Sequence, residues 1–345
     1  MSYAAVRLAS NRASIYPAAA SLLAAGLLAG TGPFAILAAW AILLAPAQAA
    51  DLVDHHQHLF SAQALSVFSA PKAITATDLI AQMDAAGIDR AVVLSAAYGF
   101  SNPFKKRGAD EYARVRAEND WVSLQVARYP RRLIGFCAVN PLRDYALREI
   151  ERCSKDPILR SGLKLHFGNS DVNLDIEEDV ERTRAVFAAA NAHGMSIVVH
   201  ARANVDHNRP YGAKQARVFL ERLLPAAPDI TVQIAHLAGG GGYDPVIDDA
   251  LSVYAEAIER GDSRVRHLYF DASGIPIAGM WEQSAALLTR RIRQIGMGRI
   301  LFGCDSPIPG NSPREFLERW RKLPLKDQEF QRIESNVAPY LSPAR

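Results

Sequence analysis

A short segment near residue 50 brings together side chains that bind metal ions. The segment DLVDHHQHLF spans residues 51–60, and Asp54, His56 and His58 stand at every second position within it. Residues two apart in a β-strand point to the same face, so these three side chains are expected to leave one strand in one direction. Imidazole nitrogens suit zinc and related divalent ions, and a catalytic site keeps one coordination position open for water. The spacing indicates a metal site, and a solvated His-rich turn is the alternative for this segment taken alone.

Polar residues recur further along the chain at a nearly constant interval. Each ends a short apolar run, and the intervals of 36, 36, 35 and 34 residues separate Lys164, His200, His236, Asp271 and Asp305. One strand, one helix and two loops need a comparable length, and this alternation is typical of βαβ units around a parallel sheet. In a (β/α)8 barrel the chemistry lies at the C-terminal ends of the strands. The sequence therefore predicts an α/β fold, a (β/α)8 TIM barrel with its metal site at those strand ends.

The remaining elements follow from the same apolar runs. A helix is expected over 77–86, with Thr77 as its N-cap, and closing helices are expected over 313–340. Strands are expected, after the first at the His pair, over 91–94, 133–139, 162–167, 196–200, 230–236, 268–271 and 300–303.

Residues 1–49 differ in composition from the rest of the chain. Arg7 and Arg12 precede a stretch without charge from Ala13 to Ala50, and residues 47–49 read Ala-Gln-Ala. A basic start, an apolar stretch and a small-x-small site are typical of a secretory signal peptide. We expect 1–49 to be a signal peptide; the alternative is an uncleaved N-terminal membrane anchor, because the two apolar segments together approach the ~20 residues that span a bilayer. Both hypotheses place the barrel domain, 50–345, outside the cytoplasm, exported or periplasmic.

The mature chain has the size of one barrel domain and little net charge. Removing 1–49 leaves 296 residues and lowers the formal net charge from +3 to +1, so no basic footprint for nucleic acid remains. A small-molecule substrate is the expected partner, and a membrane is one only if the N-terminal segment is retained. Three cysteines are too few for a disulfide framework, although an exported protein could pair Cys137 with Cys153. The metal site must use His and carboxylate ligands, because no CxxC spacing exists.

The ordered set of His and Asp residues resembles the amidohydrolase superfamily. Within it, the similarity is greatest to the metal-dependent amidohydrolase group that also contains aminocarboxymuconate-semialdehyde decarboxylase and related decarboxylases. The segments that carry the resemblance cover most of 51–345 and include VDHHQH, ENDWVSLQVARYPRRLIGFCAVNP, GLKLH, LFGCDSP and RIESNVAPYL. This group contains hydrolases of amides and lactones, decarboxylases and hydratases, so the resemblance implies a metal-dependent enzyme and leaves the substrate open.

The resemblance implies roles for individual residues. His56, His58, His200 and Asp305 would hold a divalent metal, with zinc as the expected ion. Asp305 and His236 are the candidate catalytic residues: Asp305 can accept a proton and return it to a leaving group, and His236 would either ligate the metal or bind the substrate.

Four further residues are candidates for substrate binding. They are Arg202, Lys164, His166 and Asp271. Arg202 could clamp a carboxylate or form a surface salt bridge, and Asp271 could orient a ligand or cap a turn. One metal ion is favoured, with unmodified Lys164 standing a few Å further out, and two ions are possible if Lys164 is carboxylated. His55 has the opposite strand parity and is expected to face outward as a structural residue.

Three functions remain open from the sequence. The first is an exported metal-dependent hydrolase that uses an activated water on a small-molecule amide, ester or lactone. The alternative is a metal-dependent decarboxylase or other lyase acting on an aromatic or unsaturated carboxylate. A barrel that binds a metal or ligand without catalysis is the third, and Asp305 argues against it because binding alone needs no proton acceptor.

Overall fold

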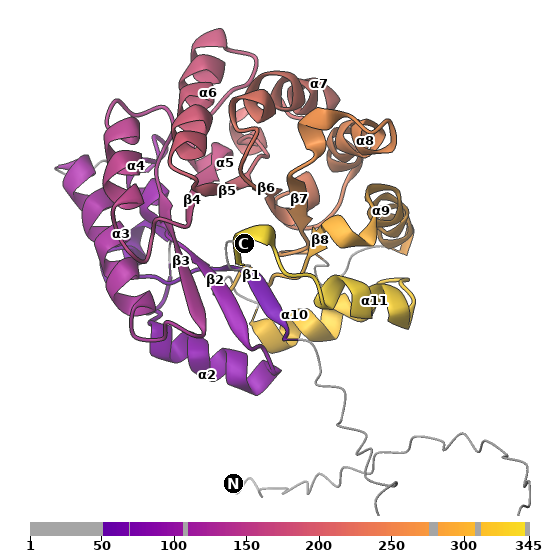
Figure 1. Ribbon diagram of the computed structural model, residues 1–345, viewed down its shortest axis with the longest axis horizontal. Helices are drawn as coiled ribbons and strands as arrows, with labels where there is room; N and C mark the ends of the chain where they lie inside the picture. Colours follow the sequence, from indigo (N-terminus) through magenta and orange to yellow (C-terminus); the bar gives the residue numbers. More distant parts are fainter. Residues whose placement is uncertain (1–50, 69, 106–109, 276–281, 308–311, 342–345) are drawn as a thin grey trace, which may run out of the picture. The chain divides into compact units, whose positions relative to one another are not determined.

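Eight parallel strands follow one another around a barrel in chain order (Figure 1). The strands are β1 (Val53–Gln57), β2 (Arg90–Leu94), β3 (Leu133–Ala138), β4 (Gly162–His166), β5 (Ser196–His200), β6 (Val232–Ile234), β7 (Leu268–Asp271) and β8 (Ile300–Leu301). Residues just after β8 return to β1, where the His55 N–H donates to the Phe302 carbonyl at 2.9 Å and Gln57 bridges Ser306 in parallel. The predicted (β/α)8 TIM barrel is confirmed.

The computed structural model describes residues 51–341 except 69, 106–109, 276–281 and 308–311. The predicted signal peptide or anchor, 1–49, lies outside the described residues. Within the described part of the chain, no helix has the length and apolarity needed to cross a membrane.

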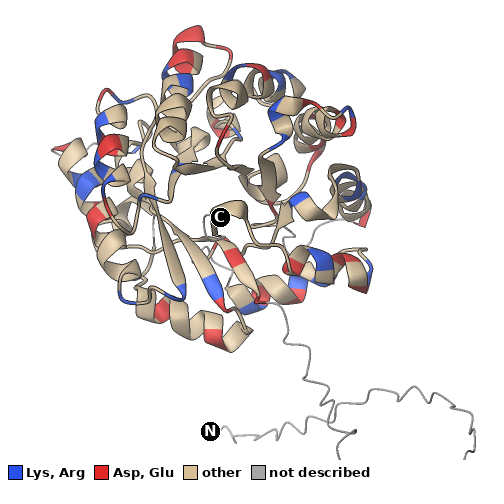
Figure 2. Cartoon of the chain, viewed as in Figure 1, with Lys and Arg blue, Asp and Glu red and all other residues tan. Residues whose placement is uncertain are grey.

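Most of the helices surround the barrel on its outer side (Figure 1). The helices are α1 (Leu65–Phe68), α2 (Ala76–Ala86), α3 (Glu111–Val126), α4 (Ala146–Ser154), α5 (Phe167–Ser170), α6 (Glu177–Ala192), α7 (Ala213–Val218), α8 (Pro245–Glu259), α9 (Glu282–Ile295), α10 (Pro313–Trp320) and α11 (Asp327–Glu334). Apolar side chains of the helices and strands form the main core. Charged side chains of both signs are mixed along the outer helices (Figure 2), and a disulfide joins Cys137 of β3 to Cys153 of α4.

The N-cap of α2 lies two residues before the predicted one. Thr75, rather than Thr77, is the N-cap: its hydroxyl accepts the backbone N–H of Asp78, and the Asp78 carboxylate accepts the N–H of Thr75. This reciprocal pair is a capping box, which satisfies two backbone donors that the first turn leaves unpaired. The prediction of Thr77 was wrong because it did not use the acidic residue three positions after Thr75.

The strand that carries His236 is shorter than predicted. β6 ends at Ile234 instead of residue 236, and a tight turn follows in which His236 has φ 55° and Leu237 has φ 48°. The Asp271 carboxylate accepts the backbone N–H of His236 at 3.0 Å, which turns the backbone away from the strand direction. Left-handed conformations are uncommon for residues with a Cβ, and they are often found at functional sites.

The C-terminal segment closes one end of the barrel. The closing helices predicted over 313–340 are α10 and α11, and a short helical turn, Pro339–Leu341, follows them. The Asn336 side chain donates to the carbonyl of Ile300, the first residue of β8, at 2.6 Å. Tyr340 packs against inward-facing strand residues, among them Leu94 and Phe136. In Figure 1 this yellow segment crosses the centre of the barrel. It therefore fills the end of the barrel where the strands begin.

Candidate metal centre

A cavity of about 360 Å³ opens at the C-terminal ends of the strands, and seven of the predicted site residues line it. Those seven are His56, His58, Lys164, His166, His200, His236 and Asp305. Its other lining residues are Phe60, Phe68, Ala70, Pro71, Tyr98, Asn169, Gly240 and Pro307. Two predicted substrate-binding residues, Arg202 and Asp271, are not among the described residues that line it.

Three of the four predicted ligands form a close group. One carboxylate oxygen of Asp305 lies 3.4 Å from Nε2 of His56 and 3.5 Å from Nε2 of His58. Four ligands arranged tetrahedrally at ~2.0–2.1 Å from a zinc ion are separated from one another by roughly 3.3 Å. The spacing of these atoms therefore fits a divalent metal.

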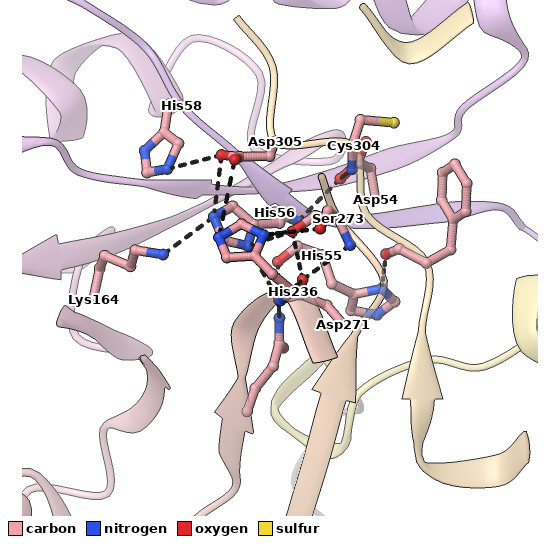
Figure 3. Close-up of polar contacts among 12 residues, drawn as sticks. Asp54, His55, His56, His58, Lys164, His236, Asp271, Ser273, Cys304 and Asp305 are labelled. Atoms are coloured by element: carbon pink, nitrogen blue, oxygen red, sulfur yellow. Dashed lines mark hydrogen bonds and ion pairs between the residues drawn. The ribbon is translucent and has the colours of Figure 1, made fainter. Parts of the chain in front are cut away.

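Hydrogen bonds on the far side of each imidazole leave Nε2 available. Nδ1 of His58 donates to the Leu94 carbonyl at 2.7 Å. Nδ1 of His56 lies 3.1 Å from an oxygen of Asp271, so the carboxylate holds the proton on that side of the ring (Figure 3). Metal-binding histidines commonly donate their second N–H to a carboxylate or carbonyl, which fixes the tautomer and the ring orientation. Both rings are buried, and both are set to present a lone pair toward Asp305.

Asp305 reaches the histidines because its backbone is bonded to β1. Its N–H donates to the His56 carbonyl at 2.8 Å, and its φ is 60°. Two residues earlier, a Cβ on Gly303 would lie 3.0 Å from Cβ of His56, so only glycine lets β8 approach the first strand this closely. The GCD motif thus places the carboxylate by close backbone contact.

His236 lies beside the three closely spaced ligands. Its Nδ1 lies 2.8 Å from the Ser273 carbonyl, and its Nε2 lies 3.9 Å from the second oxygen of Asp305. Burial lowers the pKa of His236, which favours the neutral ring. His236 can therefore exchange a proton with Asp305 or with a group bound beside it.

His200, the remaining predicted ligand, lies outside the close group of ligand atoms found among the described residues. It lines the same cavity, and its ring stacks on His166 with centroids 3.9 Å apart. A Cβ on Gly240 would lie 3.2 Å from Cε1 of His200, so the glycine run after β6 provides space for this ring. In His166, Nδ1 accepts the backbone N–H of Asn169 at 3.1 Å. Its Nε2 is therefore the N–H of the neutral ring and faces the cavity as a donor.

Lys164 stands close to the metal ligands. Its side chain is buried, and Nζ lies 3.1 Å from Nε2 of His56. Burial lowers the pKa of Lys164 to about 8, although the negative charges of Asp305 and Asp271 oppose the shift. The step across the barrel from β4 to β1 brings the amine against the imidazole, and the expectation that an unmodified lysine stands a few Å further out beside a bound metal stays a prediction.

Two other predicted substrate-binding residues are bonded to other parts of the chain. Asp271 orients His56 and also accepts the backbone N–H groups of Ser273 and His236. Arg202 forms a salt bridge of 3.3 Å with Asp244, the residue that caps α8. Asp271 thus orients a ligand and caps a turn, and Arg202 forms a salt bridge, which are the alternatives expected from the sequence; contact of either side chain with a substrate stays a prediction.

Two residues of the first motif have structural roles. The Asp54 carboxylate accepts the backbone N–H groups of His56 and Cys304 instead of facing the metal ligands, because it lies one layer lower in the barrel. Burial raises its pKa to about 6. His55 is buried and bonds the Phe302 carbonyl and the Ala338 N–H, which agrees with the structural role that was expected for it.

The sequence reasoning missed an aromatic wall that lines the same cavity and begins beside the metal ligand His58, whose ring centroid lies 6.4 Å from that of Phe60. The rings of Phe60 and Phe68 stack with centroids 4.9 Å apart, Tyr98 contacts Phe68 at 5.9 Å, and His166 lies 5.0 Å beyond Tyr98. Phe60 shares the strand parity of His58 and could have been found from it. Phe68 ends the short α1 after β1, and Tyr98 lies in a short helical turn after β2; the sequence gives no periodic signal for either segment.

The barrel and its cluster of histidines and one aspartate define a (β/α)8 fold with a metal-binding site at the strand ends. Residues 53–336 match the family model described as Amidohydrolase, and the chain belongs to this family. No curated protein matches the sequence.

Solved structures of decarboxylases and of one hydrolase share the fold. A 5-carboxyvanillate decarboxylase from Sphingomonas paucimobilis is 18% identical with a TM-score of 0.57, over 82% of this chain and 96% of its own. A dihydroxybenzoic acid decarboxylase from Polaromonas sp. JS666, with bound manganese and the inhibitor 2-nitroresorcinol, is 17% identical with a TM-score of 0.58, over 83% and 94%. A probable 2-pyrone-4,6-dicarboxylic acid hydrolase from Acinetobacter baumannii, with citric acid bound, is 16% identical with a TM-score of 0.55, over 82% and 96%.

Proposed function

We propose that this protein is a metal-dependent decarboxylase of an aromatic carboxylate. The hydrolase that ranks first from the sequence becomes the second candidate. The observation that carries the proposal is the lining of the cavity, which combines two kinds of side chain. The polar lining holds the metal ligands, Lys164 and the rings of His166, His200 and His236, and the apolar lining is the aromatic wall of Phe60, Phe68 and Tyr98, which begins beside His58.

A planar carboxylic acid fits a cavity that is lined in this way. Aromatic side chains pack against the faces or edges of a ring with centroids ~4.5–7 Å apart, so the wall suits a planar apolar body. The polar lining offers a buried ammonium at Lys164 and an N–H donor at His166, both of which bind carboxylate oxygens. A substrate with a ring at one end and a carboxylate at the other would satisfy both kinds of lining at once.

A divalent ion bound at His56, His58 and Asp305 would supply a Lewis acid that stabilises negative charge on the substrate's oxygen atoms. The chain's own residues supply the proton. When the bond between the ring carbon and the carboxylate breaks, carbon dioxide leaves and the electron pair stays on the ring carbon, which must take up one proton. Asp305 can carry that proton, and His236, 3.9 Å away, can return one to it after each turnover.

The hydrolase hypothesis rests on the same pair. Asp305 and His236 could instead remove a proton from a water molecule and pass it to a leaving group. Two of the three solved structures reported above are decarboxylases and one is a hydrolase. They favour the decarboxylase, and the aromatic wall favours it further, because a general amide or ester pocket has no need of stacked rings.

Product analysis separates the two hypotheses. The metal-loaded protein should be incubated with hydroxylated benzoic acids labelled with ¹³C at the carboxylate, and with a matched panel of lactones and amides. Release of labelled carbon dioxide, absent in the Asp305→Asn variant, is the expected result. Ring opening of a lactone without release of carbon dioxide would establish the hydrolase instead.

We further propose one divalent ion per chain. The His and Asp donor set suits both zinc and manganese. One of the related structures holds manganese, so manganese is as good a candidate for the ion as the expected zinc. Elemental analysis of protein prepared without chelator identifies the ion and its stoichiometry.

Export outside the cytoplasm is also part of the proposal. The uncharged stretch up to residue 50 supports it, and the disulfide between Cys137 and Cys153 supports it independently, because such bonds persist in oxidising compartments. N-terminal sequencing of the protein from its native host should begin at or near Ala50. A full-length chain recovered from the cytoplasm with both cysteines reduced would contradict export.

A further inference from the structure

A chain of hydrogen bonds runs from the metal ligand His56 to the far end of the barrel. Nδ1 of His56 lies 3.1 Å from one oxygen of Asp271, and the side-chain amide of Gln233 donates to the same oxygen at 2.6 Å. The Tyr340 hydroxyl donates to the carbonyl oxygen of the Gln233 side chain at 2.6 Å. Three bonded side chains therefore connect the C-terminal segment to a residue that would hold the metal.

Two acceptors allow only one orientation of the Gln233 amide, and the Tyr340 hydroxyl donates to the oxygen that this orientation leaves. The NH2 group of the amide faces the two acceptors, the Asp271 carboxylate and the backbone carbonyl of His55 at 3.3 Å. Its carbonyl oxygen faces the hydroxyl of Tyr340. Turning the amide over would set its oxygen against two acceptors inside a buried site, where an unpaired polar group costs ~1–3 kcal/mol.

Asp271, whose carboxylate Gln233 holds in place, determines which nitrogen of His56 carries the proton. Asp271 has its second oxygen occupied by the hydroxyl and N–H of Ser273 and by the N–H of His236. The first oxygen is left to Gln233 and His56, and a carboxylate can only accept. His56 must then donate from Nδ1, to this oxygen or to the Ser273 hydroxyl oxygen 3.0 Å away, which leaves Nε2 as a lone pair for the metal. The amine of Lys164, 3.1 Å from Nε2, is a donor and requires the same tautomer.

The C-terminal segment is held where this bond can form. The backbone N–H of Ala338 donates to Nε2 of His55 at 3.2 Å, and the Asn336 side chain donates to the Ile300 carbonyl. The ring of Tyr340 contacts Phe136 with centroids 5.1 Å apart. His55, beside the metal ligand in sequence, thus anchors the segment that carries the tyrosine.

We propose that Gln233 and Tyr340 are positioning residues for the metal ligand His56: acting in series through Asp271, they fix its tautomer and ring orientation from the closed end of the barrel. Neither residue touches the cavity. Their effect is on the affinity for the metal and on the protonation of the His56 ring, with or without a substrate. This inference concerns the site itself and holds for a decarboxylase and a hydrolase alike, so product analysis and the test below can fail separately.

The test uses single-group substitutions in the full mature chain. Gln233→Met keeps the length of the side chain and removes its donor and acceptor. Tyr340→Phe removes one hydroxyl and keeps the ring in the barrel. Tyr129→Phe is the matched control, because its hydroxyl also makes one hydrogen bond, to Thr77 on the outer helices, with no contact to this chain.

Two measurements are made on each variant. Titration of the metal-free protein with Mn²⁺ should show affinity weakened by about 10-fold in Gln233→Met, the lower part of the range for residues that support a ligand, with a smaller loss in Tyr340→Phe. The ¹⁵N chemical shifts of the His56 ring, in protein without metal, should show the Nδ1–H tautomer in the parent chain and a mixture in Gln233→Met. Tyr129→Phe should match the parent in both.

The double variant tests whether the residues act in series. If Tyr340 acts only through Gln233, Gln233→Met with Tyr340→Phe should bind Mn²⁺ no more weakly than Gln233→Met alone, since coupled residues are not additive. Additive losses would overturn the proposal, as would unchanged affinity and an unchanged tautomer in both single variants. Should Gln233→Met not fold, an unchanged tautomer in Tyr340→Phe would by itself overturn it.

Discussion

The amine of Lys164 lies 3.1 Å from Nε2 of His56, the nitrogen through which that histidine would bind a metal. A ligand bond of ~2.0–2.1 Å to the same nitrogen would place an ion within van der Waals contact of the amine. The metal ion and the unmodified amine cannot both keep these positions. Either the lysine withdraws when the metal binds, or it becomes an anionic carboxylated lysine and joins the ligands.

Replacing Lys164 separates these two outcomes. If the amine competes with the ion, Lys164→Met should bind Mn²⁺ more tightly than the parent, by about 10-fold, because one donor to His56 and one positive charge are removed. Turnover should fall in the same variant if Lys164 holds the substrate carboxylate. Weaker metal binding in Lys164→Met, together with an added mass of one carbon dioxide on the native parent chain, would show the carboxylated form and a site for two ions.

The pair His56 and His58 is expected to be necessary for metal binding. Replacing both with Ala removes two of the three closely spaced donors, so metal content should fall from about one ion per chain to background. The barrel should remain folded, because both side chains point into the cavity. Elemental analysis and circular dichroism check the two statements, and Thr77→Ala, on the outer helices, is a control that should keep its metal. A double variant with full metal content would remove these residues from the site.

Asp305 is expected to carry the proton of the reaction. Asp305→Asn keeps the shape of the side chain and an oxygen that can face the metal, but it cannot exchange a proton. Turnover should fall by ~10²-fold or more, while metal content falls much less. The measurement is single-turnover release of product by metal-saturated protein. Turnover close to that of the parent would move the proton transfer to His236.

The barrel and most of the site could be predicted because they depend on local periodicity. Strand parity placed His56 and His58 on one face, and the nearly constant interval placed Lys164, His236 and Asp305 at the same end of the barrel. These residues do line one cavity. The prediction succeeded where position along a strand determines direction.

The rest depends on contacts between distant segments. The left-handed turn at His236 follows from a hydrogen bond to Asp271 on another strand. The aromatic wall is formed by segments that follow β1 and β2. The segment that contains Tyr340 and packs inside the barrel comes from the last residues of the chain. Arg202 was predicted to meet a substrate or to form a salt bridge, and its salt-bridge partner is Asp244 in a different loop. Periodicity carries no information about such pairings, which depend on the path of each loop.

The aromatic wall should determine affinity for the substrate and leave the chemical step unchanged. Phe68 stacks on Phe60, contacts Tyr98 and lines the cavity. Phe68→Ala removes a stacking interaction that contributes ~1–1.5 kcal/mol of binding free energy. KM for an aromatic carboxylate should therefore rise by about 10-fold, with kcat changed by less than about 3-fold.

Arg202→Ala is the matched comparison for this variant, because Arg202 lies near the same opening but is paired with Asp244 outside the cavity. Its KM should stay within about 2-fold of the parent value, since the Arg202 side chain is paired with Asp244 and not with the substrate. Initial rates over a range of substrate concentrations, with metal saturating, measure both constants. If KM rose in Arg202→Ala and not in Phe68→Ala, the substrate would bind by a carboxylate at the mouth, and the ring would not lie against the aromatic wall.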